Sequence, residues 1–145
     1  MFKTTVKYTD FLGGEREEVL RFNLTETEMQ DLVADDIAFN PAFLGAIAKE
    51  EDPVAMYKIL RKLILHAYGE ISEDGRVFRK NEQITSDFAH SKAYEAFLEK
   101  MLGDDNNETL MRDFMIGIFP AKIGDELKKQ GYFDQGKVLP MKTVE

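Results

Sequence analysis

The sequence predicts an α+β domain that is mainly α-helical, with an N-terminal β-hairpin packed on a bundle of about five or six helices. Three observations lead to this class. Residues 2–23 alternate apolar and polar side chains, as half-buried strands do. Later segments repeat apolar residues at helical spacing, and caps and prolines mark where they begin. The length of 145 residues fits one domain with a core of its own.

The first strand is predicted over residues 2–9, FKTTVKYT, which are rich in β-branched and aromatic side chains. Because side chains alternate between the two faces of a strand, four of them share one face. These four are Phe2, Thr4, Val6 and Tyr8.

A turn is predicted at the pair Gly13-Gly14, after which residues 15–24, EREEVLRFNL, resume a weaker alternation. We expect Val19 to supply the apolar contacts of this second strand, with Leu20 and Phe22 as further candidates. These two strands and the turn between them predict a β-hairpin over residues 2–23.

The first helix is predicted to begin at Thr25, whose hydroxyl can accept a hydrogen bond from a free backbone N–H while Glu28 reaches back to the cap. Met29, Leu32 and Val33 then repeat at helical spacing. The dipeptides Asn40-Pro41 and Asp52-Pro53 each predict a further helix start, because proline is well tolerated in the first turn.

The helix that opens at Pro53 is expected to run to Tyr68 and to stop at Gly69, a residue type that tolerates the left-handed conformation. Its apolar face consists of Met56, Ile59, Leu60, Leu63, Ile64 and Ala67. A second stripe at four-residue steps consists of Lys58, Lys62 and His66, which is typical of a solvated face.

The remainder of the domain combines one turn with further helices. Asp74-Gly75 predicts a small hairpin or ordered loop within residues 69–80, pinned by Phe78. Helical patterning continues to residue 119, with breaks near Ser91 and at Gly103 and the DDNN run that follows it. The expected core is Val6, Tyr8, Leu32, Ile59, Leu60, Leu63, Ile64, Phe88, Phe97, Leu98, Leu110, Phe114 and Ile118.

The chain divides into a domain over residues 1–123, with its helices over residues 25–119, and a polar C-terminal tail over residues 124–145. Gly124, Gly131 and Gly136 punctuate this tail, and we expect it to be loosely held. A short helix over residues 122–130 is compatible with its sequence.

Composition argues against several function classes. The 19 basic and 27 acidic residues give a net charge of −8, which repels nucleic acid and anionic membranes. The absence of cysteine removes disulfides and thiolate sites and fits a reducing cytoplasm. The longest apolar runs are far shorter than the roughly 20 residues that span a bilayer. We therefore expect no nucleic-acid and no membrane partner.

A search for catalytic motifs finds none, so we expect neither an enzyme nor a cofactor. The two histidines, His66 and His90, do not lie at a metal-binding spacing. The acidic residues 104–108 lack the glycine and terminal glutamate of a calcium loop, and a solvated helix boundary is the better interpretation. There is no Walker phosphate loop and no GxSxG nucleophile elbow.

One helical segment is a candidate for partner binding. Residues 110–119 carry methionine and phenylalanine over about half of the helix circumference, wider than one core contact needs. A central helix buried between neighbours is the favoured explanation of this pattern, and a face that also receives a partner segment stays open as the alternative. The candidate partner-binding residues are Met111, Phe114, Met115, Ile118 and Phe119.

The order of four segments is familiar: VKYTDF with FNLTETEMQDL, then LRKLILHAYGEISEDGRVFRK, then SDFAHSKAYEAFLEKML, then GIFPAKI. Over about Phe2 to Ile123 the chain resembles tail assembly chaperones of siphophages infecting Gram-positive bacteria. Residues 67–80, AYGEISEDGRVFRK, carry the most specific part of this resemblance. Residues 124–145 depart from the family's compact pattern, as a lineage-specific extension or as the stretch before a frameshift.

The resemblance implies a non-enzymatic protein in the host cytoplasm that binds the phage or prophage tape measure protein and keeps it soluble during tail assembly. The family is generally absent from the finished virion. Further implied partners are the tail tube protein, a longer frameshifted product and other copies of the chain in an oligomer. Two alternatives stay open: a structural subunit of the tail or connector retained in the virion, and an acidic host-directed inhibitor that mimics nucleic acid.

Overall fold

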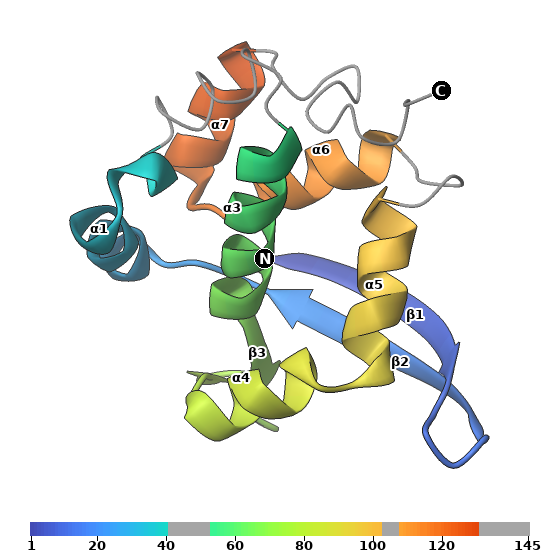
Figure 1. The fold of residues 1–145 in the computed structure, drawn as a ribbon. Helices are drawn as coiled ribbons and strands as arrows, with labels where there is room; N and C mark the ends of the chain where they lie inside the picture. Colours follow the sequence, from blue (N-terminus) through green and yellow to red (C-terminus); the bar gives the residue numbers. More distant parts are fainter. Residues whose placement is uncertain (41–52, 103–107, 131–145) are drawn as a thin grey trace.

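The computed structural model of the chain describes residues 1–40, 53–102 and 108–130. It contains an antiparallel sheet in the order β1-β2-β3-β4, with helices packed against one face (Figure 1). The strands are β1 (Phe2–Thr9), β2 (Glu15–Phe22), β3 (Tyr68–Ile71) and β4 (Phe78–Arg79). The helices are α1 (Glu26–Asp35), the 3-10 helix η1 (Ile37–Phe39), α3 (Pro53–Ala67), α4 (Glu82–Ala89), α5 (Lys92–Leu102), α6 (Glu108–Gly117) and α7 (Ala121–Gln130). The predicted class, mainly helical α+β with an N-terminal hairpin, is confirmed.

The N-terminal hairpin pairs β1 with β2 in a regular register that runs from Phe2 opposite Phe22 to Thr9 opposite Glu15. This register puts Leu20 and Phe22 on the same face as the four predicted residues of β1 and buries both. Val19 lies on the opposite face and is 46% exposed, so the prediction that it supplies the apolar contacts of this strand is wrong. The strict two-residue period of a strand explains the outcome, because adjacent residues cannot share a face.

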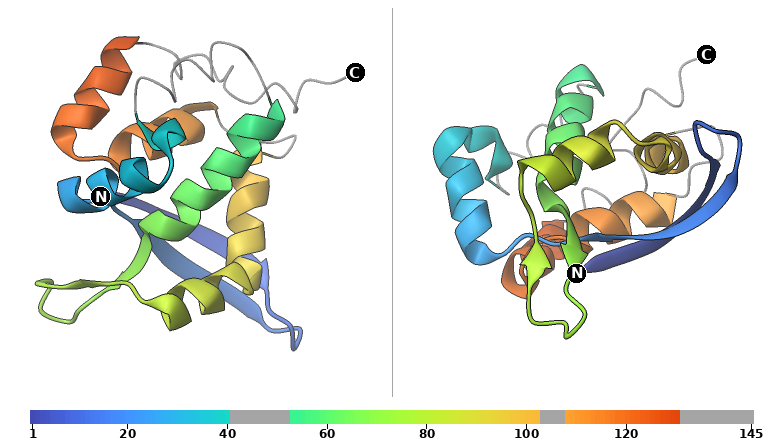
Figure 2. Two further views of the ribbon diagram at one scale, coloured as in Figure 1. Left: turned by 60° about the vertical axis from the view of Figure 1, so that its left-hand side comes forward. Right: turned by 90° about the horizontal axis from the view of Figure 1, so that it is seen from below.

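An aromatic cluster forms the centre of the core, with Phe22 in its middle. The Phe22 ring is fully buried and stacks on Phe97 at a centroid distance of 4.9 Å. It also contacts the rings of Phe2, Tyr68, Phe88 and Phe114. These five partners come from β1, β3, α4, α5 and α6, so one side chain joins the sheet to three helices. Figure 2 shows these helices gathered over the hairpin.

The second hairpin extends the sheet through pairing between β2 and β3, with Phe22 opposite Tyr68. The helix of the preceding segment therefore ends at Ala67, one residue earlier than predicted. Gly69 is an extended strand residue without a positive φ, so its predicted role as a helix end is wrong. A Cβ at Gly69 would lie 2.7 Å from the Phe78 ring and 2.8 Å from the Arg79 carbonyl oxygen. Glycine is needed here for close packing.

The predicted turn at Asp74-Gly75 is confirmed, and Gly75 has a φ of +78°. Ser72 stabilises the turn, since its hydroxyl donates to the Asp74 carboxylate at 2.8 Å and accepts from the Val77 N–H at 3.0 Å. The residue is buried. Phe78 pins the hairpin by packing over Gly69, as its position in the sequence predicted.

Helix starts follow the predicted caps where the structure describes them. Thr25 and Glu28 form the reciprocal capping box of α1. Asn81 caps α4 through a hydrogen bond of 2.8 Å from the Ile84 N–H, a cap that the sequence analysis missed. The predicted helix at Asn40-Pro41 and the break at residues 103–107 lie outside the described residues. In the C-terminal part, residues 121–130 form α7. Residues 131–145 also lie outside the described residues.

The predicted faces of the helices agree with the observed burial. Ten of the thirteen expected core residues are buried, and Tyr8, Leu98 and Leu110 are half-buried against the core. The basic stripe Lys58, Lys62 and His66 is exposed, as expected of a solvated face.

Candidate partner-binding groove

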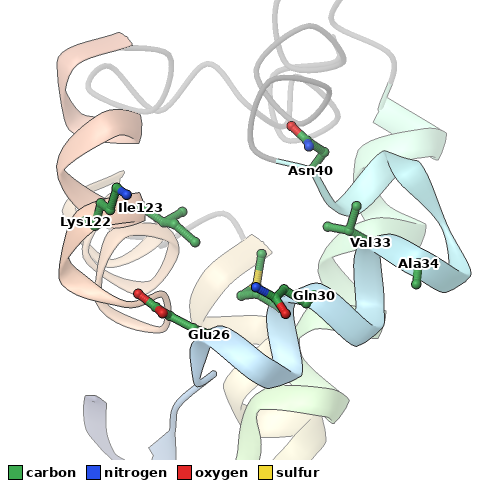
Figure 3. Close-up of a pocket in the computed structure, with 8 residues that line it drawn as sticks. Glu26, Gln30, Val33, Ala34, Asn40, Lys122 and Ile123 are labelled. Atoms are coloured by element: carbon green, nitrogen blue, oxygen red, sulfur yellow. The ribbon is translucent and has the colours of Figure 1, made fainter.

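A groove of about 760 Å³ lies between α1 and α7, two helices far apart in the sequence (Figure 3). Its described lining is largely apolar, with polar and charged side chains at the rim. The lining residues are Glu26, Met29, Gln30, Val33, Ala34, Asn40, Lys122 and Ile123. The mixture of an apolar floor and a few polar groups is typical of a site for a peptide or helix.

The α1 wall is one face of a regular helix. Its residues follow one another at helical spacing: Glu26, Met29, Gln30, Val33 and Ala34. Met29 is buried and Val33 is half-buried, whereas the remaining three are exposed. A single helix therefore supplies both the apolar floor and the polar rim of this wall.

The α7 wall is held close to α6. Gly124 is buried where a Cβ would lie 2.7 Å from the Ile116 carbonyl oxygen. The Pro120 carbonyl accepts hydrogen bonds from the N–H groups of Ile123 and Gly124, both at 2.9 Å. This packing directs Ile123 from α7 towards α1, as Figure 3 shows.

The two walls are joined at their base. The Leu24 N–H, just before α1, donates to the Ile118 carbonyl, just before α7, at 2.7 Å. A second tie comes from Lys80, whose ammonium donates to the Asn23 carbonyl and lies 2.9 Å from the Glu28 carboxylate. The start of α1 is thus held by both the end of α6 and the second hairpin.

The charged side chains of α1 are all acidic. Burial raises the pKa of Glu28, but hydrogen bonds from the Thr25 N–H and the Lys80 ammonium outweigh this effect, so the net pKa lies below its usual value. Burial lowers the pKa of Lys80, and Glu28 partly offsets that shift. Burial, followed by the charge of Lys80, also lowers the pKa of His66. Residues 26–36 contain five acidic residues and no basic one.

The candidate residues predicted on the α6 segment lie elsewhere. Met111, Phe114, Met115, Ile118 and Phe119 are all buried in the core. Phe114, for example, contacts the rings of Phe2, Phe22 and Phe97. The structure brings the five together as a packing surface of the folded chain, and a partner would reach them only if α6 moved. Their role in partner binding stays a prediction.

The groove residues were not predictable as a site from the sequence. The spacing of the α1 residues was visible in the sequence, but a helix of this composition normally shows one face to the core and one to water. Only the position of α7 opposite α1 shows that this face of α1 lines a groove.

Two specific features were sought among the described residues, a metal-binding cluster and a membrane-spanning helix. In residues 1–40, 53–102 and 108–130, no group of three or more histidine, aspartate or glutamate side chains could hold a metal ion. No helix in these ranges is long and apolar enough to span a membrane.

A small α+β fold with an apolar groove and an acidic helix does not by itself define a function. Comparison with known families identifies the class of protein: the profile of the phage tail assembly chaperone family matches residues 1–144, and the chain belongs to this family. Neither the curated proteins nor the solved structures contain a significant match. Membership of a chaperone family points to a non-catalytic role.

The match also covers residues 124–144, which the sequence analysis set apart as a tail that departs from the family. The α7 wall of the groove lies inside the matched range.

Proposed function

We propose that this chaperone binds the tape measure protein of its phage and keeps it soluble until the tail tube assembles around it. The α1/α7 groove receives an apolar helical face of the tape measure protein. No catalytic step is involved.

The observation that carries this proposal is the composition of the groove. Val33 and Ile123 present half-buried apolar surface on the two walls, above the buried side chain of Met29. Apolar surface rimmed by polar side chains is typical of protein interaction sites and ligand-binding grooves. The net charge of −8 keeps the body of the protein, and a complex that contains it, in solution.

We also propose in which cell and beside which further partners the chain acts. The chain acts in the cytoplasm of a Gram-positive host infected by a siphophage and leaves the assembly before the virion is complete. Tail tube protein and a longer frameshifted product are further partners in this setting.

Co-expression with the tape measure protein of the same genome tests the proposal, followed by affinity purification and mass determination of the complex. A soluble complex of defined stoichiometry supports it. Insoluble tape measure protein beside free chaperone of 16.6 kDa contradicts it.

A second candidate function is that of a structural subunit retained in the tail or connector. The turn of the first hairpin favours it, because Phe11 and Leu12 are 74% and 98% exposed and would suit a permanent subunit contact. Mass spectrometry of purified virions separates the two functions: stoichiometric presence in the particle supports the structural subunit, and absence supports the chaperone.

A further inference from the structure

A second pocket, of about 400 Å³, lies between α3 and the start of α5. The tip of the first hairpin borders it, and Figures 1 and 2 show this tip beside the junction of α4 and α5. The aromatic and basic side chains that line this α3/α5 pocket are Phe11, Tyr57, Arg61, His90, Lys92 and Tyr94. None of its lining residues belongs to the α1/α7 groove, so the two sites are separate.

The side chain of Arg61 is held in this pocket by two tyrosines. Its Nε donates a hydrogen bond of 3.0 Å to the hydroxyl of Tyr94, a residue of α5 that is itself buried. Its guanidinium carbon lies 5.8 Å from the centre of the Tyr57 ring, a distance at which an aromatic face attracts a cation. A hydrogen bond through Nε leaves the two terminal amino groups to pair with an anion.

The charge around Arg61 is not neutralised within the pocket. The permanently charged residues of the lining are Arg61, Lys92 and Glu95, and Glu95 pairs with Lys92 at 3.3 Å. No carboxylate of the described residues forms an ion pair with Arg61. Helix α3 adds to the positive potential, because its sequence contains lysine and arginine but no acidic residue. In a chain with a net charge of −8, such a site points to an anionic ligand from outside.

The lining favours a carboxylate over a phosphate group. Arg61 supplies one positive charge without a carboxylate partner, which matches one carboxylate, whereas a phosphate monoester carries about 1.5 to 2 negative charges. A planar guanidinium binds a carboxylate through two parallel hydrogen bonds. Beside this charge, Phe11, Tyr57 and the half-buried Leu98 supply apolar surface. A protein segment offers both groups, a carboxylate and a neighbouring apolar side chain.

We propose that the α3/α5 pocket binds an acidic segment of a partner protein, with an aspartate or glutamate carboxylate on Arg61 and an adjacent apolar side chain against Phe11 and Leu98. This site is additional to the α1/α7 groove and does not depend on the function proposed for that groove. One anchored carboxylate binds weakly by itself, so the contact contributes to a larger interface.

Titration of the isotope-labelled full chain with a short peptide, followed by nuclear magnetic resonance, tests the proposal. The probe is acetyl-Phe-Asp-Phe-amide, and its matched control is acetyl-Phe-Asn-Phe-amide, which has nearly the same shape without the charge. The aspartate peptide should shift the amide signals of residues 57–61 and 89–95 with a dissociation constant on the order of 1 mM. The asparagine peptide should bind at least about tenfold more weakly.

Three variants locate the contact. Arg61→Gln should weaken binding of the aspartate peptide at least about tenfold, because it removes the charge. Tyr94→Phe keeps that charge but removes the hydroxyl that holds Nε, so binding should weaken about three- to fivefold. Lys62→Gln is the matched control and should stay within about twofold of wild type, because Lys62 is exposed on the same helix but does not line the pocket. Circular dichroism verifies that each variant is folded.

Four outcomes would overturn the proposal. The first is an absence of shifts up to about 10 mM aspartate peptide. The second is equal binding of the two peptides to the wild-type chain, a comparison that needs no variant. The third is an equal loss in Arg61→Gln and Lys62→Gln. In the fourth, inorganic phosphate shifts the same signals at lower concentration than the aspartate peptide and identifies a phosphate site instead. Failure of the α1/α7 groove to bind tape measure protein leaves these results unaffected, because the titration uses the chaperone alone.

Discussion

The Lys80 ammonium lies 2.9 Å from the Glu28 carboxylate and joins the end of the second hairpin to the first turn of α1. The side chain of Lys80 is only 17% exposed, so its charge depends on this partner. Because Glu28 also completes the capping box, the pair fixes the start of the helix that forms one wall of the groove.

Replacing Glu28 by glutamine should lower the free energy of unfolding by about 1 to 2 kcal/mol, because the Lys80 charge then lacks its counter-charge. Glutamine can still serve in the capping box, so the loss reports mainly on the ion pair. Urea denaturation measures it. Glu26→Gln is the control: Glu26 is exposed in the same turn, and its substitution should change stability by less than about 0.5 kcal/mol. Equal losses in both variants would contradict the role of the pair.

The stability difference between wild type and Glu28→Gln should depend on pH. The pKa of Glu28 is lower in the folded chain than its ordinary value of 4.5, so the unfolded chain takes up the proton first as pH falls. The contribution of Glu28 is therefore complete above its ordinary pKa and is lost as pH falls through the folded value. Thermal unfolding from pH 7 to pH 3 should show the two proteins converging. A constant difference across this range would rule out the ion pair as its source.

Gly69→Ala should cost about 1 to 3 kcal/mol, because the new methyl group would overlap the Phe78 ring and the Arg79 carbonyl. Shortening the ring in Phe78→Leu relieves one of these contacts, so the double variant should lose less than the sum of the single losses. Chemical denaturation of the three variants gives this coupling. Strict additivity would show that Gly69 and Phe78 do not compete for space.

Phe22→Ala should lower the free energy of unfolding by about 3 to 5 kcal/mol, because it removes the ring at the centre of the aromatic cluster. Val19→Ala, from the exposed face of the same strand, should change stability by less than about 0.5 kcal/mol. Denaturation curves for both variants test the observed register. A larger loss at Val19 than at Phe22 would mean that the strand faces the other way.

Local rules account for much of this fold. The alternation in residues 2–9, the capping box at Thr25 and the Asp74-Gly75 turn are short-range patterns, and all three predicted the observed elements. Pairing of Phe22 with Tyr68 is a long-range contact that no local pattern encodes. For that reason Gly69 was assigned to a helix end and not to a crowded sheet position.

The candidate site was harder to predict than the fold. A wide apolar face such as that of residues 110–119 is compatible with burial or with a partner, and the sequence cannot distinguish the two. In the structure all five predicted residues are buried. The groove depends on Val33 and Ile123 coming together from distant segments, which hydrophobic spacing within one helix does not reveal.

Binding of the tape measure protein through the α1/α7 groove is the central claim, and a matched pair of glutamine variants tests it most directly. Gln30 lies in the groove and Gln83 lies on α4, both are exposed, and each is replaced by arginine. Each variant is co-expressed with the tape measure protein, and the amount that co-purifies is measured. We predict that wild type and Gln83→Arg retain a stoichiometric complex and that Gln30→Arg loses most of it. Equal retention by both variants would contradict the groove as the binding site.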